Sequence, residues 1–187
     1  MKITVSTVAD AQADFIIRCT ELFVEKPQWR DVKVVAKSMK KTDANSRKAK
    51  FRQLSRYVQE IFCAQLLRRF VHCFLKTNFE HWVFGRTCAY SSGLKSVVSE
   101  KELFVLAMRS YLLKSDEKLG LDMSINQVDE NFSVTIIGSN GVPTMQFKFE
   151  PKPIVRLQRL IIRVTTCFET IDKLSVIKYA WTSVKEN

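Results

Sequence analysis

The sequence predicts an α+β protein that has a mostly helical N-terminal part and a small antiparallel sheet further along the chain. Through much of residues 1–120, apolar residues recur at spacings of three and four, which is typical of helices. Between about 121 and 150 they alternate in twos, which is typical of strands. With 187 residues, 46% of them hydrophobic, the chain can bury one core. We therefore predict a single domain over 1–187, mainly helical in 1–120 and holding a meander and a helix in 121–187.

The N-terminal segment predicts a short strand followed by a helix. "MKITVSTV" alternates apolar and polar residues, and Thr7 with Asp10 resembles a capping box that opens a helix. Apolar residues of 15–23 then follow at helical spacing until Pro27 stops the run. The next segment, "DVKVVAKSM", fits a strand or a short helix equally well.

A long helix is predicted from about Ala44 to Asn78, because this stretch contains no glycine or proline. An apolar stripe repeats along it at spacings of three and four, formed by Phe51, Leu54, Val58, Ile61 and Phe62. Its second half, "IFCAQLLRRFVHCFLK", is apolar on nearly all sides, so we expect a buried central helix. Gly85 and Gly93 then mark a connecting region. Ser99 and Glu102 form a second capping box, which predicts a helix that closes near Gly120.

The C-terminal third predicts a three-stranded antiparallel meander over about 121–150, covered by a helix. "LDMSINQV", "NFSVTIIG" and "PTMQFKFE" alternate in twos and are separated by turn-forming residues. Pro151 and Pro153 mark the next boundary. The segment "IVRLQRLIIRVTTCFETIDKL" then places apolar residues on one helical face, so a helix is expected there.

The net charge of +11 is concentrated in the first half of the chain, which favours a polyanionic partner such as nucleic acid or an anionic membrane surface. Two basic ridges carry this interpretation, one on each predicted long helix. The first consists of Lys48, Arg52 and Arg56, and the second of Lys152, Arg156, Arg159 and Arg163. Tyr57 is a candidate for stacking on an unpaired base. The predicted nucleic-acid-binding residues are Lys40, Lys41, Arg47, Lys48, Lys50, Arg52, Arg56, Tyr57, Lys152, Arg156, Arg159 and Arg163. The alternative is that both ridges are only the solvated faces of amphipathic helices.

These observations lead to two hypotheses of function. The first is a non-enzymatic nucleic-acid-binding protein that makes sequence-independent contacts to the phosphate backbone, as suits an RNA-binding viral or ribonucleoprotein component. The second is a matrix-like assembly or interaction subunit, oligomeric or associated with a membrane surface. Trp82 and Trp181 would anchor its interfaces.

Nothing in the sequence indicates an enzyme, a cofactor, a small-molecule substrate or a metal site. Neither a phosphate-binding G-x-x-x-x-G-K-[ST] loop, a G-x-G-x-x-G fingerprint nor a G-x-S-x-G elbow occurs. His72, Cys73, His81 and Cys88 include metal-binding residue types, but they lack the close cysteine pair typical of zinc sites.

Asp129, Gln146 and Lys148 faintly resemble the carboxylate and Q-x-K arrangement of some metal-dependent nucleases. We interpret Asp129 as a turn residue, and the other two as the solvent face of a strand.

The five cysteines are odd in number and irregularly spaced, which is typical of free thiols in a reducing compartment. We find neither a leader-like apolar region at the N-terminus nor an uncharged stretch of about 18 apolar residues. The expectation is a soluble intracellular protein, cytoplasmic or nuclear.

Overall fold

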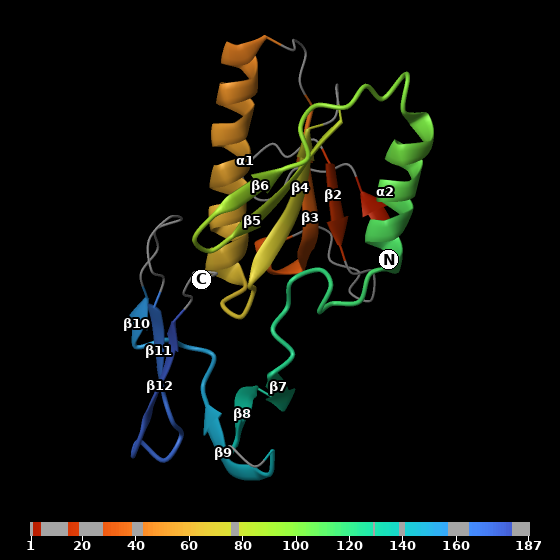
Figure 1. The fold of residues 1–187 in the computed structure, drawn as a ribbon. Coiled ribbons are helices and arrows are strands. Elements are labelled where there is room, and N and C mark those ends of the chain that lie inside the picture. Colours follow the sequence, from red (N-terminus) through yellow and green to blue (C-terminus); the bar gives the residue numbers. More distant parts are fainter. Residues whose placement is uncertain are drawn as a thin grey trace, which may run out of the picture.

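The computed structural model describes residues 2–4, 15–18, 28–38, 43–75, 79–128, 130–138, 141–156 and 165–180. Within these residues the chain forms two α-helices, one short 3-10 helix and twelve strands arranged in three sheets (Figure 1). The protein is therefore rich in sheet, and the predicted mostly helical N-terminal part is wrong.

The largest sheet has six strands that follow one another in chain order, from β1 to β6. All neighbours are antiparallel except β3 and β4, which are parallel and are connected through the helix α1. A 3-10 turn, η1 (Trp29–Asp31), precedes β3. The strands are β1 (Lys2–Thr4), β2 (Phe15–Arg18), β3 (Val32–Lys37), β4 (Phe70–Leu75), β5 (Glu80–Gly85) and β6 (Ala89–Ser91). The helix predicted over 15–23 is wrong at 15–18, where β2 lies, and its remaining residues lie outside the described parts of the chain.

Helix α1 (Ala44–Ala64) covers one face of this sheet. It begins at Asp43, whose carboxylate accepts a hydrogen bond from the backbone N–H of Ser46 at 2.9 Å. Its apolar stripe includes Leu54, Val58 and Ile61, which are fully buried against β3 and β4. The stripe predicted from the sequence is therefore the surface that attaches α1 to the sheet.

The predicted helix from 44 to 78 is wrong beyond residue 64, because its second half contains β4. This strand lies inside the sheet and is buried on both faces: Val71 and Cys73 face α1, and Phe74 faces the opposite side. A strand of this kind is apolar at every position and therefore gives no alternation in the sequence. It pairs with β3 on one side and with β5 on the other, which places it inside the sheet.

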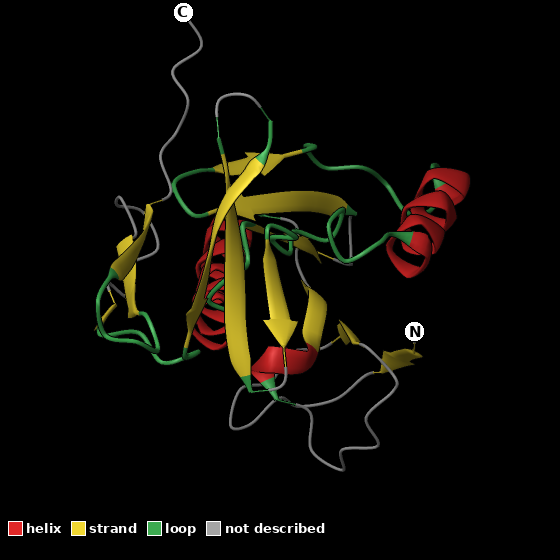
Figure 2. Ribbon diagram, turned by 90° about the horizontal axis from the view of Figure 1, so that it is seen from below, coloured by secondary structure: helices red, strands yellow, loops and turns green. Residues whose placement is uncertain are grey.

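Helix α2 (Lys101–Leu113) lies on the face of the sheet opposite α1 (Figures 1 and 2). Tyr111 is buried between α2 and the sheet, where its ring stacks on Phe74 with the ring centroids 6.1 Å apart. The helix ends at Leu113, earlier than the predicted end near Gly120, and Ser99 does not cap it: its N-cap is Glu100, which makes no capping side-chain bond.

The predicted three-stranded meander is confirmed. Its strands β7 (Ile125–Val128), β8 (Asn131–Ile137) and β9 (Pro143–Phe149) pair antiparallel in sequence order. The alternation was visible because Ile125 and Phe149 are buried, whereas their neighbours Asn126 and Lys148 are exposed.

The helix predicted after Pro153 is wrong, because a second small sheet lies there. It contains β10 (Val155–Arg156), β11 (Thr165–Glu169) and β12 (Val176–Ala180), which pair antiparallel in the order of the chain. Phe168 packs on Phe149 of the meander, with ring centroids 4.9 Å apart, so the two small sheets share one core.

No helix among the described residues is both long enough and apolar enough to cross a membrane.

Candidate functional site

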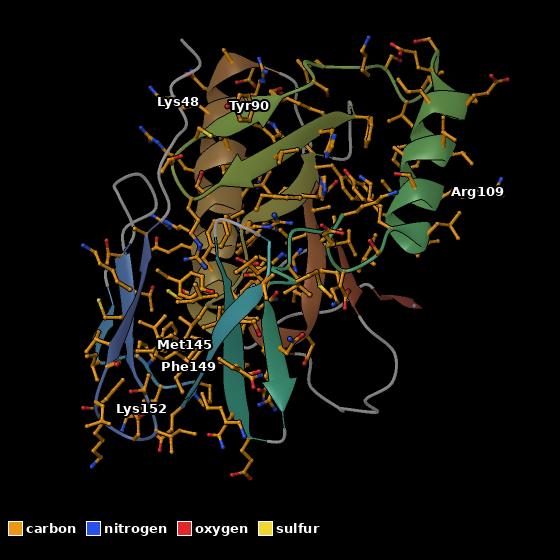
Figure 3. The ribbon with its side chains drawn as sticks, turned by 60° about the horizontal axis from the view of Figure 1, so that its bottom comes forward. Lys48, Tyr90, Arg109, Met145, Phe149 and Lys152 are labelled. Carbon is orange, nitrogen blue, oxygen red and sulfur yellow. The ribbon has the colours of Figure 1, made fainter. Side chains whose placement is uncertain are left out.

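The first predicted basic ridge is present on α1. Lys48, Arg52 and Arg56 are exposed along one side of the helix, and Figure 3 shows Lys48 near its beginning. Two residues predicted to lie on the same binding surface instead contact other parts of the protein. Arg47 reaches the sheet, and Tyr57 is 4% exposed and stacks on Trp29. Lys50 lies beside Gln53, 3.4 Å from its amide oxygen.

Arg47 forms an ion pair with the buried carboxylate of Glu80 on β5. The carboxylate has no solvent exposure, and it also accepts a hydrogen bond from the hydroxyl of Ser91 at 2.6 Å. Burial alone would raise the pKa of Glu80, but the hydrogen bonds from Arg47 and Ser91 outweigh burial and lower it. Arg47 is therefore a structural cation that joins α1 to β5.

The second predicted ridge does not exist as a helical surface. Lys152 is exposed in a bend before β10, and Arg156 lies in the strand β10. A strand places successive side chains on opposite faces, so the helical spacing on which this ridge was built does not apply. Lys40, Lys41, Arg159 and Arg163 lie outside the described residues, as do Trp181 and Asp129.

Two buried arginines fix the end of α1 to the sheet. Arg68 has no solvent exposure, and its guanidinium donates to the carbonyl oxygen of Phe70 at 3.0 Å and to the side-chain oxygen of Gln65 at 2.8 Å. Arg86 donates to the carbonyl oxygens of Arg68 and Leu66. Burial lowers the pKa of Arg68 to about 10, so this residue stays charged at neutral pH. Arg86 also donates to the carbonyl oxygen of Gln65, the C-cap of α1, where the negative end of the helix dipole stabilises a cation.

The two histidines of the chain, the buried His72 and the partly buried His81, form a pair between the sheet and α2. Nδ1 of His72 and Nε2 of His81 are 3.1 Å apart, and Nε2 of His72 lies 3.2 Å from the carbonyl oxygen of Lys118. Burial, together with the charge of Lys114, lowers the pKa of each histidine to about 4. Both are therefore neutral at physiological pH, and one ring donates to the other.

These histidines do not complete a metal site. Within the parts of the chain that the structure describes, no three histidine, cysteine or acidic residues come close enough to share a metal ion. Burial raises the pKa of the Cys73 thiol, which is unfavourable for a thiolate ligand or nucleophile. Gln146 and Lys148 are exposed on β9, as their interpretation as a solvent face predicts.

The β10–β12 sheet presents one covered face and one open face. Phe168, Ile177 and Tyr179 point into the core shared with the meander. On the open face, Lys178 of β12 is exposed and stands opposite Cys167 of β11 in the antiparallel register. Val176 lies two residues before Lys178 on the same face and is 58% exposed.

Lys178 is the functional candidate that sequence reasoning missed. It makes no hydrogen bond or ion pair with another described residue, so its ammonium group is available to a ligand. The segment "SVIKYAW" follows a six-residue hairpin connection and is rich in β-branched and aromatic residues. That composition predicts a strand. It was overlooked because the apolar residues before it follow helical spacing, which predicted a helix there.

Trp82 also differs from its expected role as an exposed interface anchor. It is partly buried and packs on Phe51, with the ring centroids 4.7 Å apart.

Comparison with known proteins finds that residues 15–187 match the family described as fungal protein kinase. No curated protein and no solved structure matches the chain. The family match overturns the expectation of a non-enzymatic nucleic-acid-binding protein, and with it the expectation that the chain is no enzyme. The RNA-binding, viral and ribonucleoprotein interpretations are wrong for the same reason. They relied on charge, and part of that charge serves the fold: Arg68 and Arg86 are buried, and Arg47 pairs with the buried Glu80.

Proposed function

Because the chain belongs to the fungal protein kinase family, we propose that its β10–β12 sheet is part of a kinase nucleotide-binding site in which Lys178 contacts the phosphates of ATP. Protein kinases place a loop over the phosphates of ATP, and a lysine on a following strand, in the motif V-A-I-K, pairs with the α- and β-phosphates. The order of elements here is the same: strand β10, a connecting segment, strand β11, a short turn and strand β12 with Lys178.

The residues around Lys178 support this proposal. Ile177 and Lys178 match the last two residues of the V-A-I-K motif, and Val176 stands where the motif has alanine. Ile177 points into the core, so its packing fixes the strand, and Lys178 therefore points away from that core. Val176 and Cys167 provide an apolar surface beside the lysine, as a flat nucleotide base requires.

The sequence between β10 and β11 departs from the kinase pattern. Residues 157–164 contain no glycine, whereas the kinase loop follows the pattern G-x-G-x-x-G-x-V. Glycine allows the backbone to approach a phosphate group closely. We therefore expect a lower affinity for ATP than in kinases that keep these glycines.

The proposal concerns recognition of the nucleotide. The kinase motifs that supply the catalytic base and hold Mg²⁺, H-R-D-x-x-x-x-N and D-F-G, are not in this sequence. We assign no role in the transfer step to these 187 residues.

The test is a comparison of nucleotide binding between two lysine variants. Lys178→Met removes the proposed phosphate contact, and Lys148→Met removes an exposed lysine of β9 as a matched control. A hydrogen bond to a charged group is worth about 1.5–3 kcal/mol, so Lys178→Met should weaken ATP and ADP binding by about tenfold or more. Isothermal calorimetry measures these affinities, and circular dichroism checks that each variant folds.

Adenosine provides the second arm of the test. It lacks phosphates, so its affinity should be equal for the unmodified chain and for Lys178→Met. Undetectable ATP binding, or an ATP affinity that Lys178→Met and Lys148→Met lower equally, would refute the proposal.

A further inference from the structure

Helix α2 is apolar on two opposite sides. One side, formed by Phe104, Ala107, Met108, Tyr111 and Leu112, packs against the six-stranded sheet. The other side carries Val105, Leu106 and Leu113, whose side chains are 62%, 62% and 72% exposed. A helix that only covers a sheet needs one apolar stripe, and its outer side is normally polar. The outer side of α2 therefore has the composition of an interface.

Two charges of opposite sign lie along the middle of this outer side, and the exposed Lys101 lies at its edge. Glu102 lies near the start of the helix and Arg109 lies two turns later, on the same side as Leu106. Neither forms an ion pair or a hydrogen bond with another described residue. Figure 3 shows Arg109 on the side of α2 that faces away from the sheets. Both charges are available to a partner.

We propose that α2 packs antiparallel against α2 of a second copy of this chain. A two-fold axis between Val105 and Leu106 would place Glu102 and Arg109 at equal distances on either side of it, because a helix rises evenly along its axis. Each Glu102 then stands opposite Arg109 of the second copy. Two copies of one surface can pair in this way only if that surface is self-complementary, and this one is.

The apolar residues obey the same symmetry. Val105 stands opposite Leu106 of the second copy at the centre of the contact. Leu113 stands opposite Val98, which lies in the turn before α2 and is 78% exposed. Along the contact, the ion pairs therefore lie between the central Val105–Leu106 pairs and the outer Leu113–Val98 pairs, so each charge is placed between apolar side chains.

A second copy suits this surface better than a membrane does. An anionic membrane surface attracts basic helices, whereas Glu102 places an acid on the apolar side. Stable complexes bury about 1,200–2,000 Å² in total, and a single pair of short helices buries less. We therefore expect a weak dimer with a dissociation constant in the micromolar range.

Charge reversal at the two flanking positions tests the proposal. In a homodimer of Glu102→Arg, the introduced arginine of each copy would face Arg109 of the other. In a homodimer of Arg109→Glu, the introduced glutamate of each copy would face Glu102 of the other. Either variant alone should weaken self-association by about tenfold or more. Mixing the two variants should restore dimers, because each copy then presents two flanking charges of the sign opposite to those of its partner.

Sedimentation velocity over a concentration series measures the association, with Glu60→Arg, which makes the same change on the exposed side of α1, as the control. Leu106→Asp should abolish the dimer without unfolding the chain, because Leu106 is exposed. A chain that stays monomeric throughout the series would overturn the proposal. Dimers that persist in Leu106→Asp would overturn it as well, and so would variants that fail to associate when mixed.

Discussion

The six-stranded sheet and the β10–β12 sheet differ in what their charged residues contact. Around the larger sheet, Arg47 pairs with the buried Glu80, and Arg68 and Arg86 donate hydrogen bonds to backbone carbonyl oxygens. In the smaller sheet, one face is closed by Phe168 and its neighbours, and the other presents Lys178 with no partner among the described residues. Charges of the first kind stabilise the fold, and a charge of the second kind is available for binding.

This comparison also explains why net charge was a poor guide to function. A count of basic residues treats Arg68 and Lys178 alike, although one is inaccessible and the other is exposed. The accessibility of each cation and the identity of its neighbours decide its role.

The largest expected effect concerns the buried histidines of the larger sheet. Their pKa values are about 4 in the folded protein and about 6.5 in the unfolded chain, so the unfolded chain binds protons first as the pH falls. The free energy of unfolding is therefore highest above about pH 6.5 and decreases toward about pH 4, by roughly 3 kcal/mol or more.

Urea unfolding at several pH values measures this dependence. The double variant His72→Phe, His81→Phe should show a shallower decrease than the unmodified chain, whatever its stability at neutral pH. Equal slopes for the two proteins would contradict the assignment of neutral, buried histidines.

The next effect separates two adjacent residues of α1. Arg47→Ala leaves the carboxylate of Glu80 buried without its cation, and loss of one partner of a buried ion pair typically costs about 3–5 kcal/mol. We expect the lower end of that range, because the side chain of Arg47 is 40% exposed and water can replace part of it. Lys48→Ala, one residue away and exposed, should change stability by less than about 0.5 kcal/mol. Thermal unfolding of the two variants distinguishes them, and equal losses would argue against a structural role of Arg47.

A smaller effect is expected at Gly120. This residue follows α2 in the chain and packs against Phe70 at the start of β4. Its φ is +102°, and an added Cβ would lie 2.1 Å from the carbonyl oxygen of Phe70. Gly120→Ala should therefore destabilise the protein by about 1–3 kcal/mol or more. Gly93 also has a positive φ, of +74°, but no atom lies within 4 Å of its added Cβ. Gly93→Ala should cost about 1 kcal/mol, from backbone strain alone. Equal losses in the two variants would show that the contact with Phe70 is unimportant.

The smallest effect on stability is expected for Lys178→Met, since its side chain is exposed and makes no ion pair with the rest of the described chain. The free energy of urea unfolding should stay within about 0.5 kcal/mol of the unmodified value. The same substitution is expected to weaken nucleotide binding, whereas Arg47→Ala should leave binding unchanged where the chain is folded. A large loss of stability in Lys178→Met would show that this lysine stabilises the fold, as the arginines of the larger sheet do, and would contradict its assignment as a binding residue.

Sequence reasoning predicted the meander and the apolar stripe of α1, whose two faces differ in exposure. It missed β4, which is buried on both faces. The meander was predicted because Ile125 and Phe149 are buried while their neighbours face solvent. The stripe of α1 was predicted for the same reason. Strand β4 was interpreted as helix, because Val71 to Leu75 are all buried and a short apolar run fits both periods.

The candidate site was missed for a second reason. Residues 157–171 contain apolar residues at helical spacing, which favoured a helix over the two strands. Tertiary packing overrode that local pattern, since Phe168 and Ile177 are held by the meander. The absence of glycine in residues 157–164 also removed the usual sequence sign of a phosphate-binding loop.

The parallel pairing of β3 and β4 has a consequence for how the chain folds. Hairpins such as β4–β5 close over a few residues, whereas β4 can meet β3 only after the intervening helix α1 has been placed. Contacts between residues distant in sequence must offset the entropy of closing a long loop, and they slow folding. We expect the docking of α1 together with β4 to limit the folding rate, so substitutions at Val58 or Ile61 should slow refolding more than substitutions in the meander.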